Sequence, residues 1–224
     1  ISSIIDTGSA DDFICSLASL IKRLAVDHLH LVGDIFDRGP RADLIIDRLM
    51  AYHSIDVQWG NHDILWMGAA SGSAACLAAV IRNNVRYDSL KILESAYGVS
   101  LRELTMFAEQ TYRKKDGMDP VEKAISVILF KLEGQTILRH PNWQMDDRLL
   151  LEHVDPARGV VTIDGAEHKM RTSDFPTLDP QNPYSLSEGE QLVMENLMSA
   201  VLHSEKLQAH IGFLYDHGAA YLVH

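Results

Sequence analysis

Two short polar loops contain the side chains that could carry out chemistry. The first has the sequence GDIFDRG at residues 33–39, and the second has GNHD at residues 60–63. Asp34 offers two carboxylate oxygens, Asn61 an amide oxygen and His62 a titratable imidazole. Taken singly, each loop can also be read as an ordinary turn. Together they supply groups for a phosphoryl site, in which a carboxylate can bridge two metals about 3.5–4 Å apart.

The residues around these loops predict that both lie at one edge of a parallel sheet. Residues 28–32 form a short apolar run that ends at Gly33, and residues 55–59 form a second. Pro40 stands where helices often begin. The helix after it is expected to direct four apolar side chains toward a core, namely Leu44, Ile45, Leu49 and Met50. A strand, a helix and a strand within about thirty residues predict a right-handed crossover, whose loops open at the carboxyl edge where α/β proteins bind ligands.

Further helices are predicted on both sides of this unit. A helix capped by Asp11 or Asp12 has apolar side chains at helical spacing, namely Phe13, Leu17, Leu20, Ile21 and Leu24. From about residue 64 the pattern is mainly helical. Capping boxes are predicted at Ser100 and Ser187, and the second begins one long helix whose apolar face extends to Leu214.

The remaining segments favour loops and short strands. Residues 140–185 are rich in Pro, Asp and Gly, with short strands predicted at 149–151 and 160–163. Gly218 is expected to cap the last helix, after which residues 219–223 could return to the sheet as a strand.

Composition excludes some classes of partner. Twenty basic and 31 acidic side chains give a net charge of −11, the wrong sign for a nucleic-acid-binding protein. No apolar run reaches the roughly 18–20 residues of a membrane helix.

Cys15 and Cys76 lie in apolar helical patterns, which predicts buried reduced thiols and a cytoplasmic protein. Because the sequence begins at Ile1, we interpret it as a fragment.

Both loops match the middle motifs of the calcineurin-like metallophosphatases, which read GD, two further residues and DRG, and then GNH followed by Asp or Glu. Beyond the motifs, residues 28–68, 97–98 and 204–208 resemble class III fructose-1,6-bisphosphatase of the Firmicutes type, and the resemblance covers nearly the whole chain. It implies an α/β fold that is part of a metallophosphatase αββα sandwich with a large, mainly helical insertion. Residues 1–70 would be a partial core, 71–217 the insertion and 218–224 the start of a returning core strand.

The resemblance also implies roles for individual residues. Asp34 would bridge two metals, and Asn61 would bind the second. His62 would be the acid that assists the leaving sugar oxygen, with Asp37 orienting it, and Arg38 would hold the phosphate rather than form only a salt bridge. Mn²⁺ is the implied metal, with Mg²⁺ as an alternative.

The chain lacks some of the family's motifs, and its remaining Asp and His residues are not expected to bind metal. Asp63 is expected to be a structural hydrogen-bonding residue. No Asp-any-His tripeptide precedes Gly33, and the chain ends at His224 before the family's downstream ligand histidines. Histidines recur every seven residues from 203 to 224, a helical rise of about 10.5 Å that is too long for shared metal bonds, so solvated or packing roles are predicted. A metal pair at His28 and His30 is conceivable, but a supporting or core role is favoured.

The implied activity is metal-dependent hydrolysis of fructose 1,6-bisphosphate to fructose 6-phosphate and phosphate, a gluconeogenic step. The chain would supply part of a dinuclear site, act on a small sugar bisphosphate and be weakly active or inactive alone. A homo-oligomer is allowed, whereas nucleic acid and membrane are not expected partners. Two alternatives stay open: another calcineurin-like phosphoesterase, acting on phosphoproteins or nucleotides, or a non-catalytic scaffold that lost metal ligands.

Overall fold

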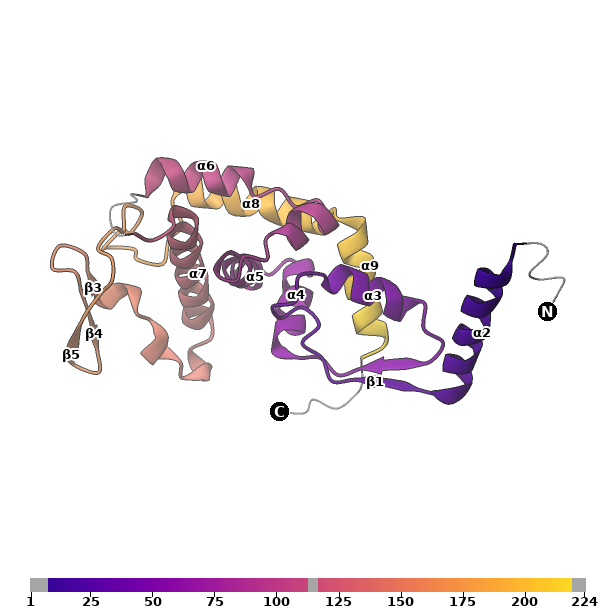
Figure 1. The fold of residues 1–224 in the computed structure, drawn as a ribbon. Coiled ribbons are helices and arrows are strands. Elements are labelled where there is room, and N and C mark those ends of the chain that lie inside the picture. The colour runs from indigo at the N-terminus through magenta and orange to yellow at the C-terminus, as the bar shows by residue number, and fades with distance from the viewer. Residues whose placement is uncertain (1–7, 113–116, 219–224) are drawn as a thin grey trace.

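The computed structural model describes residues 8–112 and 117–218. Two parallel strands and an isolated helix lie at one end, an antiparallel sheet lies at the other, and helices fill the space between them (Figure 1). The architecture is mixed α/β and largely helical. In chain order the helices and strands are α2 (Ala10–Ala25), β1 (Leu29–Leu31), α3 (Ala42–Met50), β2 (Ile55–Val57), α4 (Asn61–Ala70), α5 (Ala74–Arg86), η1 (Ile92–Ala96), α6 (Arg102–Thr111), α7 (Pro120–Arg139), η2 (Pro141–Trp143), η3 (Asp146–Arg148), η4 (Leu151–His153), β3 (Val154–Asp155), β4 (Val160–Ile163), β5 (Ala166–Lys169), α8 (Glu188–Leu202) and α9 (Glu205–Asp216).

The predicted crossover unit is confirmed. β1 and β2 pair in parallel, with Leu29 opposite Ile55 and Leu31 opposite Val57, and α3 connects them. On the other side of β2, Gly218 forms a parallel bridge with Val57. The strand predicted at 219–223 lies outside the described residues.

The prediction that Gly218 caps the last helix is wrong. His217 is the cap residue of α9, and Gly218 is not among the described glycines with a positive φ. A Cβ at Gly218 would overlap the Trp59 indole. Close approach of Trp59, rather than helix capping, therefore requires glycine here.

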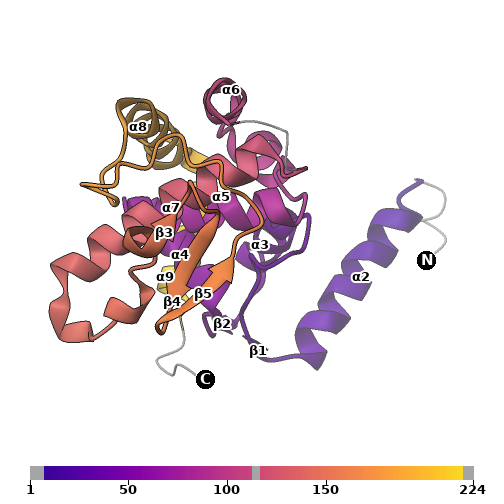
Figure 2. The ribbon, with the colours of Figure 1, turned by 90° about the vertical axis from the view of Figure 1, so that its left-hand side faces the viewer.

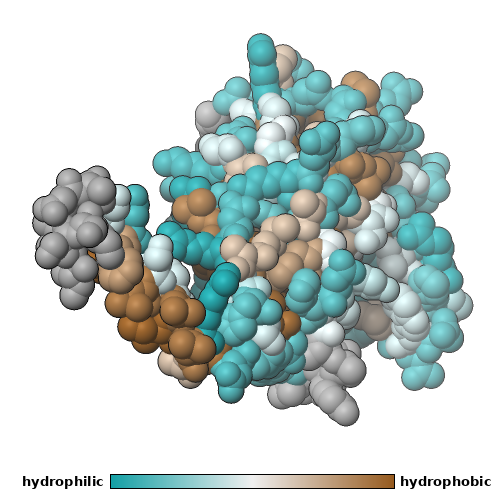
Figure 3. Space-filling model, turned by 90° about the vertical axis from the view of Figure 1, so that its right-hand side faces the viewer, coloured by the Kyte–Doolittle hydropathy of each residue, from teal (hydrophilic) through white to brown (hydrophobic). Residues whose placement is uncertain are grey.

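Helix α2 forms where predicted, but the prediction that Asp11 or Asp12 caps it is wrong, because Ser9 is its N-cap residue. None of its residues is buried, and the exposed fractions of its large apolar residues run from 44% at Leu17 to 74% at Leu24. Figure 2 shows α2 standing apart from the other helices, and Figure 3 shows apolar side chains along it. Cys15 on this helix is exposed, which corrects its predicted burial, and Cys76 is partly buried.

Helix α3 is also rotated relative to the prediction. Leu49 is buried as expected, but Leu44, Ile45 and Met50 are exposed, and Ile46 lies in the core instead. Helical spacing identifies alternative apolar stripes, and the packing of α3 against α9 and η1 selects the one that contains Ile46.

Helix α7 forms the centre of the helical body, packed against α5 and α6. Its Lys131 is fully buried, and Nζ lies 2.7 Å from Glu190 Oε2 on α8 and donates at 2.7 Å to the Thr177 carbonyl. A buried charge needs such partners, so this pair joins α7 to α8 and to the loop before α8. Among the described residues, no helix is both long and apolar enough to cross a membrane.

One predicted capping box is confirmed and the other is wrong. Ser187 Oγ accepts from Glu190 N at 3.3 Å, and Glu190 Oε2 accepts from Ser187 N at 2.8 Å. Ser100 does not cap α6, because the helix begins at Arg102 with Leu101 as its N-cap residue, and Glu103 bonds to Asn196 of α8. The single long helix predicted after Ser187 is two helices.

The break between α8 and α9 has a visible cause. Ser204 lies between the two helices, and its hydroxyl donates to the Tyr97 carbonyl at 2.6 Å. Apolar periodicity is the same in one long helix and in two consecutive ones, so the sequence pattern does not reveal this turn.

In the irregular segment, the strand predicted at 160–163 is β4, which pairs antiparallel with β3 and β5. The strand predicted at 149–151 is wrong. Leu149 and Leu151 are buried in a small separate cluster with Ile137 and Tyr184. The apolar side chains there reflect burial within turns rather than strand pairing.

Candidate active site

The first loop leaves β1 through two left-handed residues. Gly33 has φ +88° and Asp34 has φ +53°. A Cβ at Gly33 would overlap the Gln58 carbonyl beyond β2, so the two loops approach closely only with glycine here. Aspartate is one of the few other residues that tolerates this conformation, which recurs at functional sites.

The second loop brings the N-terminus of α4 to the Asp34 carboxylate. Asp34 Oδ1 accepts a hydrogen bond from His62 N at 3.1 Å. A Cβ at Gly60 would overlap the same carboxylate, so glycine again permits the contact. The carboxylate thus lies where the partial positive charge of a helix N-terminus favours an anion. The structure places Asp34, in the loop after β1, and Asn61, the first residue of α4, at one sheet edge, as predicted.

The Asp63 carboxylate connects the two loops by hydrogen bonds. Its Oδ1 accepts from Phe36 N at 3.1 Å and its Oδ2 from Gly60 N at 3.0 Å, and the side chain is fully buried. Burial raises the pKa of this carboxyl, while the backbone N–H donors lower it. These contacts agree with the structural role predicted for Asp63.

His62, Asp37 and Arg38 share one corner of this edge. His62 Nε2 lies 3.0 Å from Asp37 Oδ1, and Arg38 Nε lies 3.5 Å from the same oxygen. That oxygen is buried and, within the described ranges, has no aligned hydrogen-bond partner. The Arg38 guanidinium carbon lies 4.5 Å from the centre of the Tyr87 ring. The three residues predicted to bind phosphate and move a proton are therefore neighbours.

A buried aromatic cluster supports the first loop. Phe36 stacks on Trp66 at 4.5 Å between ring centres, and Tyr97 packs against both. The Tyr97 hydroxyl lies 3.0 Å from His210 Nδ1, and His210 Nε2 lies 2.8 Å from Asp47 Oδ1. Burial raises the pKa of Tyr97, so the phenol keeps its proton and can donate it to Nδ1.

The sequence predicted a packing or solvated role for His210 but not this chain of contacts. His210 is fully buried, whereas His203 and His217 each contact a backbone carbonyl four residues earlier. His224 lies outside the described residues. A histidine on the apolar face of α9 was the available signal, but its partners come from α3 and η1, far away in sequence.

The donor set of the two loops fits a divalent metal in chemistry but is incomplete. Asp34 and Asn61 offer the oxygen donors that Mn²⁺ and Mg²⁺ prefer, and the buried Asp37 Oδ1 lacks an aligned donor. In the part of the chain that the structure describes, no three His, Cys, Asp or Glu side chains are grouped to hold a metal.

Comparison with known proteins decides the family. The family model for Firmicute fructose-1,6-bisphosphatase matches residues 1–224. The chain belongs to this family. It is 46% identical to "Fructose-1,6-bisphosphatase class 3 1" of Clostridium beijerinckii, over 99% of the chain and 36% of the relative. It is 47% identical to the class 3 fructose-1,6-bisphosphatase of Porphyromonas gingivalis ATCC 33277, over 100% of the chain and 37% of the relative. The chain thus spans just over a third of the length of these relatives, and no solved structure matches it.

Two other features of this fructose-bisphosphatase family chain lie outside the two loops. His28 Nε2 and His30 Nδ1 contact one oxygen of Asp56, at 2.9 and 2.8 Å. Both histidines are half exposed, so a core position is wrong for them. They share a strand face, as predicted, and that face holds an aspartate.

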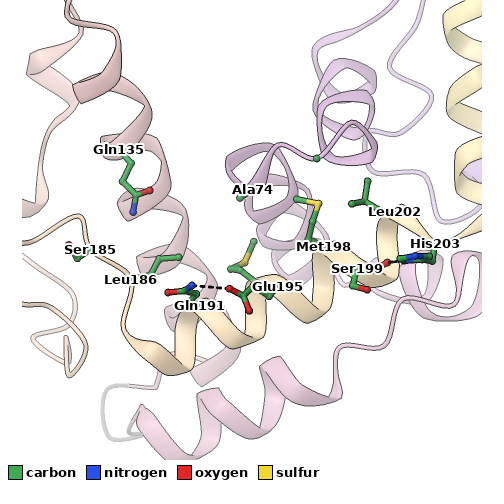
Figure 4. A pocket seen from close by; sticks show the side chains of 12 residues that line it. Ala74, Gln135, Ser185, Leu186, Gln191, Glu195, Met198, Ser199, Leu202 and His203 are labelled. Atoms are coloured by element: carbon green, nitrogen blue, oxygen red, sulfur yellow. Dashed lines mark hydrogen bonds between the residues drawn. The ribbon is translucent and has the colours of Figure 1, made fainter.

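A cavity of about 770 Å³ lies between α8, the start of α5 and α7 (Figure 4). Met194, Met198 and Leu202 contribute its apolar wall, and Gln191 and Glu195 bond to each other at its rim. None of the predicted site residues lines it.

Proposed function

We propose that the full-length protein containing this chain hydrolyses fructose 1,6-bisphosphate at its 1-phosphate, releasing fructose 6-phosphate and phosphate. The observation that supports this most directly is the family match over the whole chain, combined with both motif loops meeting at one sheet edge. Because the relatives are almost three times as long, further site residues would come from outside the 224 residues.

Asp34 and Asn61 would hold divalent cations, with Mn²⁺ proposed and Mg²⁺ as the alternative. Cations at this position would supply a nucleophilic water and neutralise phosphate oxygens. Asp34 Oδ1 keeps a further lone pair after accepting from His62 N, and Oδ2 is a second donor. Asp34 can therefore serve two cations while still holding the start of α4.

The neighbouring side chains would bind and protonate the substrate. Arg38 presents a guanidinium fork suited to two phosphate oxygens. His62, when protonated, would donate its proton to the leaving sugar oxygen. Asp37 Oδ1, 3.0 Å from Nε2, would stabilise the imidazolium and fix its orientation.

We also propose that β1, β2 and the segment at Gly218 belong to one sheet of a metallophosphatase sandwich. Val57 supports this, because it pairs with Leu31 on one side and forms a parallel bridge with Gly218 on the other. Residues 1–70 and 218–224 would then be core, and residues 71–217 a mainly helical insertion that leaves and re-enters beside β2.

The test is a substrate panel on the full-length protein with Mn²⁺. Phosphate release should be much faster from fructose 1,6-bisphosphate than from a phosphopeptide or a nucleotide. Preference for either of those would favour another phosphoesterase, and no turnover with any of them would favour a scaffold. The 224-residue chain alone should bind fewer than two Mn²⁺ tightly and turn over poorly. Full activity of that chain would show that the missing ligands have been misplaced.

A further inference from the structure

Tyr87, which lies in the helical insertion, contacts Arg38 of the first site loop through its aromatic ring. We propose that Tyr87 is a positioning residue for Arg38, holding its guanidinium where the substrate phosphate binds. This inference rests on the proposed function, in which Arg38 binds phosphate. It adds a residue from outside both motif loops.

The contact leaves Arg38 free to bind an anion. The guanidinium carbon lies over the Tyr87 ring, 4.5 Å from its centre, which is a cation–π distance. A guanidinium carries five N–H donors, so contact with one ring leaves donors available for an anion. The Arg38 Nε lies 3.5 Å from Asp37 Oδ1, and 63% of the side chain is exposed. Within the described ranges the Arg38 guanidinium donates no hydrogen bond.

The turn that presents Tyr87 is held in place. Tyr87 N donates to Asn83 O at 3.1 Å, which ends α5. The buried Asn84 donates to the Val80 carbonyl at 2.8 Å and accepts from Ser89 Oγ at 2.9 Å. Asp88, with φ +52°, then reverses the chain. The ring is therefore presented by a fixed turn rather than by a free loop.

The contact between Arg38 and Tyr87 adds little to the stability of the fold. Tyr87 is 45% exposed and Arg38 more so, and an exposed pair of this kind contributes little to folding. A long arginine side chain without a partner samples many rotamers, and a ring that selects one of them lowers the entropy lost when phosphate binds.

The experiment is a double-mutant cycle in the full-length protein. Tyr87→Leu, Tyr87→Phe, Arg38→Ala and the double variant Arg38→Ala/Tyr87→Leu are compared with wild type. Two readouts are taken: kcat and KM for fructose 1,6-bisphosphate, and the Kd of inorganic phosphate by calorimetry with Mn²⁺ present. Trp143→Leu is the matched control, since Trp143 is also an exposed aromatic, stacked on His140 in another part of the insertion.

Tyr87→Leu should raise KM and the phosphate Kd about two- to fivefold, with kcat changed less than about twofold. Tyr87→Phe should restore both, because the ring remains. In the Arg38→Ala background Tyr87→Leu should have no further effect, and Trp143→Leu should behave as wild type. An unchanged phosphate Kd in Tyr87→Leu, or the same loss with Arg38 already removed, would overturn the inference. Failure of wild type to hydrolyse the sugar bisphosphate would refute the proposed function instead, while the phosphate Kd cycle would still decide the role of Tyr87.

Discussion

Asp63 gives the sharpest test of how the two site loops are joined. Its carboxylate accepts one backbone N–H from each loop, Phe36 N at 3.1 Å and Gly60 N at 3.0 Å, in a fully buried position. Asp63→Asn keeps the size of the side chain but replaces one acceptor oxygen with an NH₂ group. The backbone N–H of one loop then meets the NH₂ group instead of an acceptor oxygen.

The magnitude follows from opposing effects. A hydrogen bond to a charged group contributes about 1.5–3 kcal/mol, and a buried N–H left without a partner costs about 1–3 kcal/mol. The substitution also removes a buried charge whose desolvation raises the pKa of Asp63. We therefore expect a net loss of about 1–3 kcal/mol in unfolding free energy.

Urea denaturation of the full-length protein, followed by tryptophan fluorescence, measures this loss. Asp179→Asn is the control, because Asp179 accepts Gln181 N at 2.9 Å in an exposed turn where asparagine serves equally well. Asp63→Asn should lower the midpoint clearly, and Asp179→Asn should hardly change it. Equal midpoints for Asp63→Asn and wild type would refute the view that Asp63 joins the loops.

The pH dependence supplies a second reading of the same pair of proteins. A carboxyl with a raised folded-state pKa binds protons more readily when folded, so its contribution to stability falls as pH rises from 3.8 through the raised pKa. Wild type should therefore lose stability relative to Asp63→Asn across that window, and other carboxyls cancel in the difference. If wild type instead gained stability relative to Asp63→Asn as pH rises, the pKa of Asp63 would not be raised in the folded state.

Three further substitutions follow from the same contacts. His62→Ala should lower kcat by roughly 10²- to 10⁴-fold while metal content by elemental analysis stays unchanged, and loss of metal instead would make His62 a ligand. Asp37→Asn should lower kcat in the same direction but less, and an unchanged kcat would remove its proposed role. Hydrogen bonds from Lys206 and then His210 lower the pKa of Asp47. Its contribution to stability is present above pH 3.8 and is lost as pH falls through the folded pKa, so acid should destabilise wild type more than Asp47→Asn, and identical acid transitions would contradict this.

Local patterns predicted the site loops well because the strands, the helix between them and the glycines of the loops each have a signal within a short stretch of sequence. Strand, helix and strand were read from apolar runs and Pro40, and the parallel pairing confirms them. Gly33 and Gly60 permit the close approach of the loops, and both glycines are visible in the sequence. The roles assigned to Asp34 and Asn61 remain predictions.

Features that depend on distant partners could not be predicted in the same way. The apolar stripe of α2 is real, but no sequence pattern says what, if anything, covers it. Ser100 and Glu103 have the spacing of a capping box, yet Glu103 bonds to Asn196, 93 residues away. The contacts of His210 with Tyr97 and of Arg38 with Tyr87 likewise join segments that only the fold brings together.

Elemental analysis of Asp34→Asn tests most directly whether Asp34 serves two metals. A bridging carboxylate offsets the repulsion between two close cations, so removing its charge should disturb both positions. At matched free Mn²⁺, the full-length wild type should hold two Mn²⁺ per chain, Asp34→Asn less than one, and Asn61→Ala about one. Circular dichroism should show that each variant stays folded. A folded Asp34→Asn protein that retains two Mn²⁺ would contradict the bridging role and the site proposed around it.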